Sequence, residues 1–172
     1  SGLELFYLNK FIDEYYSDLS MIGKFSNLFF IKNHNLSLMK FNNQFELGYK
    51  FVASRNLNQK LSIPSNELTR VNYILSNPSK SLFSLNFLSS YIGKDNFNNS
   101  VLELFNSDQP LGSLNQIKNI FELSSSKDLK WFFDNYLDYD GLIDLKISTK
   151  KGKYKLKNIV GKNLSFPVPV KI

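Results

Sequence analysis

The chain has 172 residues, of which 42% are hydrophobic and 21% are charged, which suits a folded domain and excludes disordered and fibrous proteins. It contains no cysteine and a single histidine, so disulfide bonds, thiol chemistry and thiolate metal sites are excluded. The formal net charge is +6, but residues 1–144 carry a net charge of −2, whereas residues 145–172 carry eight lysines and no acidic residue.

The first part of the chain predicts helices. Apolar side chains recur every three to four residues over 3–16, which is typical of an amphipathic helix with one buried face. The same spacing predicts helices over about residues 20–32 and 43–56. We expect a polar loop around His34 to separate these two helices.

Proline residues mark the next helix. Pro64 is a favourable residue at a helix start, with Ser62 or Ser65 as the cap, and this helix is expected to run to about Leu75. We expect it to end at Asn77-Pro78-Ser79, because proline lacks a backbone N–H and disfavours the helical conformation in the residue before it.

The second part of the chain predicts a series of shorter helices. An apolar stripe over residues 82–92 stops at Gly93, whose freedom to adopt a positive φ favours a helix end. Each later helix is expected to follow a small polar residue that caps its free amides. These caps are Asp95 or Asn96 for a helix to about residue 108, Ser113 for the next, and Ser126 for a last helix over about 127–137.

The apolar pattern changes to a period of two from Leu142 to Ile147, which is typical of a strand. A turn at Lys151-Gly152 leads to a second predicted strand, and the two prolines of Phe166–Val170 favour an extended or edge segment. The sequence therefore predicts a mainly α fold, with a multi-helix bundle over residues 1–140. A few β-strands are expected to follow over residues 141–172, as a hairpin or the start of a β module.

The side chains offer little self-contained catalytic chemistry. A catalytic zinc ordinarily has three protein ligands, and one histidine argues against such a site within this chain. The chain has no Gly-x-Ser-x-Gly motif whose serine could use His34 as its base, so we expect His34 to be an ordinary surface or interface histidine. The acidic cluster lacks the closing glutamate of a calcium loop, and capping and solvation are expected of its members, Asp134, Asp138, Asp140 and Asp144.

Composition also bears on partners. Lysines can meet phosphates, but the chain has two arginines, Arg55 and Arg70, and arginine is the residue that favours bidentate recognition. We therefore expect solvated lysines on an exposed hairpin, and nucleic acid is not an expected partner. The longest stretch without a charge, residues 81–93, is far shorter than the ~20 apolar residues of a membrane-spanning helix. Most of the aromatic residues are expected to pack in the core.

Three segments together resemble the aminopeptidase N family of zinc metallopeptidases. Ser1-Gly2-Leu3-Glu4-Leu5-Phe6-Tyr7 is similar to the Glu-Gly-x-Ala-x-Tyr segment that follows the zinc-binding histidines of that family. Leu88 to Phe97, with Gly93, resembles its Leu-Gly-x-x-x-Phe element. Lys127 to Tyr136 resembles its Asp-Leu-x-x-Phe-Phe-x-x-Trp signature, and 35 positions separate Gly93 from Asp128, about the separation in the family.

This resemblance implies a thermolysin-like, C-terminal helical part of a catalytic domain that leads into a β module. The chain departs from the family at three points. Ser1 occupies the position of the third zinc ligand, the His-Glu-x-x-His helix would lie upstream, and Pro78 occupies the position of the tyrosine that stabilises the transition state. Tyr73 is a nearby tyrosine but falls out of register. Proline cannot donate a hydrogen bond to an oxyanion.

The resemblance implies the cleft-forming portion of a zinc peptidase, with the missing N-terminal part of the parent protein and a peptide as partners. We expect the chain alone to be inactive, and zinc only in an intact, active parent. Because the chain begins at Ser1 without methionine, its native start is expected upstream. Two alternatives remain open, a non-catalytic helical module that binds proteins or peptides and a nucleic-acid binder that works through the lysine-rich tail.

Overall fold

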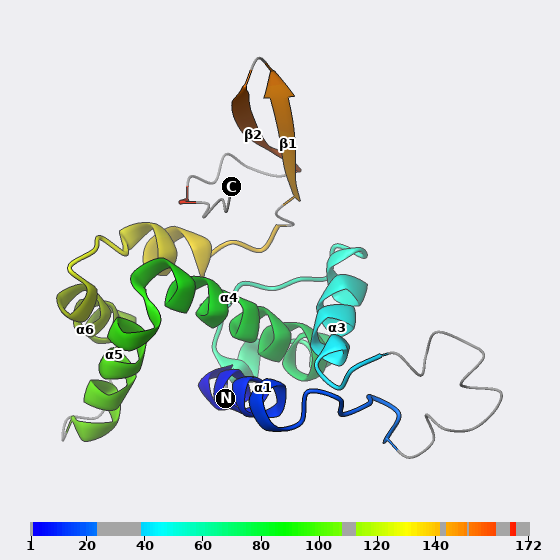
Figure 1. Ribbon diagram of the computed structural model, residues 1–172, viewed down its shortest axis with the longest axis horizontal. Helices are drawn as coiled ribbons and strands as arrows, with labels where there is room; N and C mark the ends of the chain where they lie inside the picture. Colours follow the sequence, from blue (N-terminus) through cyan, green and yellow to red (C-terminus); the bar gives the residue numbers. More distant parts are fainter. Residues whose placement is uncertain are drawn as a thin grey trace. The chain divides into compact units, whose positions relative to one another are not determined.

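The computed structural model is mainly helical and ends in two antiparallel strands, so the predicted fold class is confirmed (Figure 1). It describes residues 2–23, 39–107, 113–141, 144–150, 152–160 and 166–167. The chain divides into two compact units, one formed by residues 1–57 and 65–85 and the other by residues 58–64 and 86–172. Within the described residues, every helix is too short or too polar to cross a bilayer.

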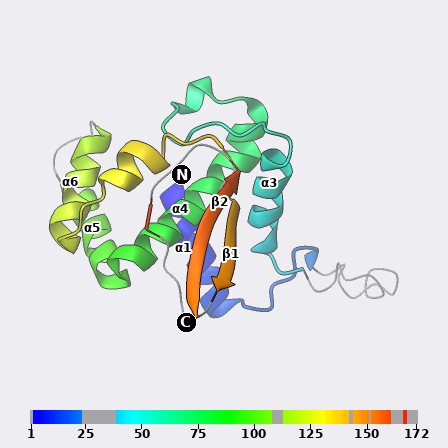
Figure 2. The ribbon, with the colours of Figure 1, turned by 90° about the horizontal axis from the view of Figure 1, so that it is seen from above.

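The first unit contains α1 (Gly2–Tyr15), α3 (Asn43–Ala53), the short η3 (Ser65–Glu67) and the π-helical η4 (Asn72–Ser76). It also contains the first half of α4 (Asn77–Ile92), beside which α1 lies (Figures 1 and 2). Helix α1 forms as predicted, but it buries only Phe6 and Ile12, and Leu8 and Tyr15 of the predicted buried face are exposed. Helix α3 ends three residues before its predicted end. The apolar core of this unit comprises Phe6, Ile12, Val52, Ala53 and Leu82.

The helix predicted over residues 20–32 is wrong at its start. Ser20 pairs with Lys40 in an isolated antiparallel bridge, and the backbone N–H of Met21 donates to the carbonyl of Met39 at 2.8 Å. Residues 20–22 form this bridge and a turn, so the predicted helix does not begin at Ser20. The remainder of the predicted helix and His34 lie outside the described residues.

The two predictions based on proline are also wrong. Residues 64–69 form only the short η3, and the chain is then helical from residue 70 to Ile92, so Pro78 ends no helix. The wider turns of η4 come directly before Pro78, with the N–H of Asn77 donating to the carbonyl of Asn72. A π turn opens the backbone, which gives room to a proline ring that would collide with the preceding turn of a regular α-helix.

The second unit contains the second half of α4, α5 (Lys94–Asn106), α6 (Leu114–Ser125), the π-helical η5 (Trp131–Tyr136), β1 (Asp144–Lys150) and β2 (Lys153–Val160). Gly93 ends α4 with φ +95°, as predicted, and it is also the N-cap of α5, so the caps predicted at Asp95 or Asn96 are wrong. Ser113 caps α6 in a full capping box with Gln116, which confirms that prediction.

Ser126 has the opposite role from the predicted one. It adopts a left-handed conformation with φ 54° and ends α6, and its N–H donates to the carbonyl of Glu122. The Asp128 carboxylate then accepts a hydrogen bond of 2.8 Å from the N–H of Lys130, at the start of η5. An aspartate three residues before η5 therefore supplies the start signal that the sequence analysis assigned to serine.

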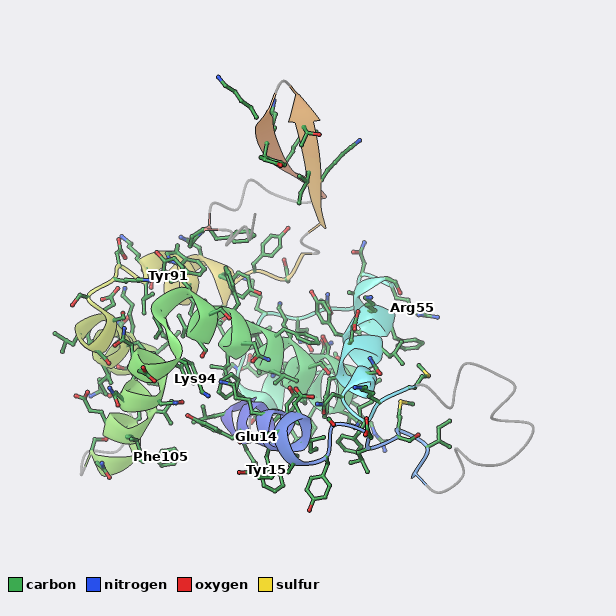
Figure 3. All side chains as sticks on the ribbon, viewed as in Figure 1. Glu14, Tyr15, Arg55, Tyr91, Lys94 and Phe105 are labelled. Carbon is green, nitrogen blue, oxygen red and sulfur yellow. The ribbon has the colours of Figure 1, made fainter. Side chains whose placement is uncertain are left out.

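Aromatic rings fill the core of the second unit. Phe97 is fully buried, and its ring meets that of Phe121 edge to face at 5.5 Å between centroids. The ring centroid of Phe121 in turn lies 6.3 Å from that of Phe133. Leu129, which belongs to the same segment as Phe133, residues 127–136, is fully buried. Most of the described aromatic residues are nevertheless half-buried or exposed, such as Phe105 at 74% exposure (Figure 3), so the prediction that most of them pack in the core is wrong.

The hairpin of β1 and β2 turns at Gly152, whose φ is +72°, close to the predicted turn. Its register pairs Lys146 with Lys157, Ile147 with Leu156, Ser148 with Lys155 and Thr149 with Tyr154. Figure 2 shows the two strands as one twisted ribbon. Of the extended segment predicted beyond it, the structure describes only Phe166 and Pro167, which lie in no helix or strand.

Candidate functional site

The candidate site is a cavity of about 430 Å³ within the first unit. The volume lies in the range of ~300–1,000 Å³ that is usual for small-ligand pockets. The start of α1, the η3 region, η4 and the first turns of α4 form its wall. The residues that line it are Gly2, Ser65, Leu68, Tyr73, Asn77, Pro78 and Ser81, and none of them is charged.

A close approach of two helices forms one edge of this cavity. A Cβ atom added to Gly2 would lie 2.5 Å from the Cβ and 3.0 Å from the Oγ of Ser81. No real side chain tolerates the first distance, so α1 and α4 can meet in this way only with glycine at position 2. Small residues on both helices therefore bring the start of α1 against the first turns of α4.

The cavity wall offers hydrogen-bonding groups without charge. The Oδ1 atom of Asn77 is buried and has no hydrogen-bond partner among the described residues, although a buried acceptor usually accepts a hydrogen bond. Tyr73 is 59% exposed, so its hydroxyl is open to solvent, and the hydroxyls of Ser65 and Ser81 add donors and acceptors. Groups of this kind can bind the amide N–H and C=O groups of a peptide main chain.

The structure brings together some of the residues that the sequence singled out. Pro78, which occupies the expected tyrosine position, lines the cavity, and Tyr73 lines it as well, although the two are five positions apart. The extra residue of the π-helical turn contributes to this arrangement, because it shifts the residues before it around the helix axis. Ser1, at the expected position of the third zinc ligand, lies outside the described residues, as does His34.

The residues of the cavity do not fit zinc. Their side chains supply hydroxyl, amide and apolar groups, whereas zinc sites in proteins use histidine, cysteine and carboxylate ligands. Within the ranges that the structure describes, no group of three or more such residues could hold a metal ion. Zinc ligands at this cavity would therefore have to come from residues other than those described.

Two members of the acidic cluster, Asp134 and Asp138, form ion pairs in the second unit. The Asp138 carboxylate accepts hydrogen bonds of 2.8 Å from Lys60 Nζ and from Ser62 Oγ, and Asp134 lies 3.3 Å from Lys118 Nζ. The hydrogen bond from Lys60, followed by that from Ser62, lowers the pKa of Asp138 below its ordinary value. The same bond raises the pKa of Lys60. These carboxylates therefore tie segments together, and Asp140 is exposed.

Sequence reasoning missed a second, half-buried aromatic cluster in the second unit. The Trp131 ring lies 5.4 Å from that of Phe87 and 5.2 Å from that of Tyr91, both edge to face. The Nε1 atom of Trp131 is buried without a partner among the described residues. Lys127 Nζ lies 4.5 Å from the centroid of Tyr91, a cation–π contact. The spacing of Phe87 and Tyr91 on one helix, four residues apart, is the signal that could have indicated this cluster.

The cavity thus combines a neutral, polar wall with a proline in that wall. No protein-family model, curated protein or solved structure matches this chain.

Proposed function

We propose that the chain is the helical, cleft-forming portion of an aminopeptidase N-like zinc metallopeptidase, and that its cavity binds peptides. The observation that carries the proposal is the meeting of the first segment that bears the resemblance with the region of the expected tyrosine position. Gly2, from the segment similar to Glu-Gly-x-Ala-x-Tyr, lies against Ser81, three residues after the position expected for the catalytic tyrosine. The two segments are about 75 positions apart in sequence, and both line the same cavity.

The other two segments of the resemblance support the proposal as packing elements. Gly93 and Phe97 form the helix junction and core of the second unit, while Leu129, Phe132 and Phe133 are buried in it. In this proposal residues 127–136 stabilise the core of the second unit, and the first unit supplies the cleft. The proposal therefore separates residues that keep the fold from residues that face the ligand.

Within this proposal the chain alone binds peptides but does not cleave them. Pro78 has no hydroxyl to stabilise a developing oxyanion, and none of the described residues in the cavity wall is an ordinary general base. The zinc and the water that it would activate belong to an intact parent, with ligands from the missing N-terminal part. The neutral lining favours contacts to the peptide main chain over contacts to charged side chains.

Titration of the purified chain with tetra-alanine, followed by amide chemical shifts in NMR spectra, tests peptide binding. We expect saturable shifts at Gly2, Tyr73 and Ser81, and a weaker affinity for Tyr73→Ala. Tyr15→Ala is the matched control, because Tyr15 is 65% exposed on α1 and does not line the cavity (Figure 3). Absence of saturable shifts would contradict peptide binding. Stoichiometric zinc together with release of alanine would contradict the expected inactivity.

A second candidate, a non-catalytic module that binds another protein, is favoured by the exposed face of α1. Leu8, Phe11 and Tyr15 recur at helical spacing and are 45%, 49% and 65% exposed. If Phe11→Ser removed binding of a protein partner while tetra-alanine binding persisted unchanged, this second function would be favoured. If Tyr73→Ala left tetra-alanine binding unchanged and Phe11→Ser left protein binding unchanged, neither the cavity nor the exposed face of α1 would be the binding site.

A further inference from the structure

The hairpin carries a face of lysines that no part of the proposed function uses. Paired residues of antiparallel strands lie on the same face, and side chains alternate along each strand. Lys146 and Lys157 are directly paired, and Ser148 is paired with Lys155, so these residues share one face with Lys153. We call Lys146, Lys153, Lys155 and Lys157 the lysine face, and all four are exposed.

The charge of the lysine face is not balanced within the hairpin. Like charges that lie directly opposite each other destabilise a strand pair, and Lys146 faces Lys157 in this way. Residues 145–172 contain no acidic residue, and none of the four lysines forms an ion pair with any residue that the structure describes. The repulsion between these lysines is relieved most by a partner that carries regularly spaced negative charge.

We propose that the lysine face binds the phosphate backbone of double-stranded DNA without sequence preference. Lysine acts on phosphate as a point charge, whereas base reading favours arginine, which this face lacks. Lys153, Lys155 and Lys157 alternate along β2, which spaces them by about 6.7 Å, or two nucleotide rises of a DNA strand. The major groove of B-form DNA is wide enough to admit a two-stranded ribbon.

The opposite face of the hairpin distinguishes DNA from other anionic partners. Ile147, Thr149 and Tyr154 lie there, and Tyr154 is 61% exposed. Binding of single strands relies on aromatic rings that stack on bases, but this ring lies on the face away from the lysines. An anionic membrane would take up the apolar face and leave the lysines pointing away from it. The lysine face can bind the phosphates of a duplex without any contribution from the opposite face.

Fluorescence anisotropy with a short labelled DNA duplex at increasing salt tests the inference, which does not depend on peptide binding. Each neutralised phosphate contributes a slope of about −0.9 to log affinity against log salt, so four lysines give about −3.6. The affinity should then fall about 150-fold between 50 and 200 mM salt. For Lys153→Gln/Lys155→Gln/Lys157→Gln we expect a slope of about −0.9 and a fall of only about 3.5-fold.

The matched control is Lys40→Gln/Lys94→Gln/Lys130→Gln, which removes the same charge from exposed positions outside the hairpin. We expect this control to bind DNA with the salt slope of the unchanged chain. Equal loss in both triple variants would overturn the inference, because binding would then follow net charge rather than the lysine face. Tighter binding of a single strand of equal charge, or binding to phosphatidylserine vesicles but not to the duplex, would also overturn it. Circular dichroism verifies that each variant is folded.

Discussion

Replacement of Phe97 by alanine should strongly destabilise the second unit. The side chain is fully buried and meets Phe121 edge to face at 5.5 Å. Removal of a core phenylalanine costs about 3–5 kcal/mol, of which about 0.5–1.5 kcal/mol comes from the ring pair itself. For a urea dependence of about 2 kcal/mol per M, a loss of 4 kcal/mol lowers the unfolding midpoint by about 2 M.

The fluorescence of Trp131, the only tryptophan, reports on unfolding of this unit because it belongs to the same compact unit as Phe97. Leu102→Ala is the control on the same helix, since Leu102 is 58% exposed and surface substitutions change stability by at most about 0.5 kcal/mol. Equal midpoints for Phe97→Ala and Leu102→Ala would refute the reasoning. Such a result would mean that Phe97 does not contribute to the core of the second unit.

Three further predictions concern contacts of single residues. Gly2→Ala should lower the melting temperature although alanine favours helices by up to about 1 kcal/mol, and Ser81→Gly should restore it; failure of that rescue contradicts the close approach of α1 and α4. Ser113→Ala should cost about 1 kcal/mol in urea unfolding because it removes the capping box of α6, and an unchanged midpoint would contradict that role. Asp138→Asn should destabilise the chain at pH 7, because Lys60 lowers the pKa of this carboxyl. The stabilisation is complete above the ordinary carboxyl pKa of about 4 and is lost as pH falls through the lowered pKa, so melting temperatures of the two proteins should converge in acid. A difference that persists in acid would contradict the ion pair.

Local patterns in the sequence predicted the helices that depend on a single amphipathic face or a single cap. Helix α1, the end of α4 at Gly93 and the start of α6 at Ser113 follow such signals and are confirmed. The hairpin is confirmed for the same reason, since alternation and one glycine turn suffice to specify it. In each case the residues that determine the structure are neighbours along the chain.

The wrong predictions concern contacts that form between distant residues or an unusual local backbone. The pairing of Ser20 with Lys40 spans twenty positions and leaves no mark in the spacing of apolar residues. The helical conformation around Pro78 requires a π turn, which simple proline rules do not foresee. The cavity itself could be anticipated only in part, since the resemblance indicated Pro78 but not the approach of Gly2 to Ser81.

The π-helical turn before Pro78 has a consequence for the variation that this chain can tolerate. A π turn is equivalent to one extra residue in an α-helix, and one residue corresponds to about 100° of rotation about the axis. Deletion of Ile74, Leu75 or Ser76 would therefore turn Tyr73 out of the cavity while Asn77 and Ser81 stayed in place. Changes in the length of this segment would therefore change which ligand the cavity accepts more than most substitutions would. They replace all the side chains that η4 contributes to the cavity wall.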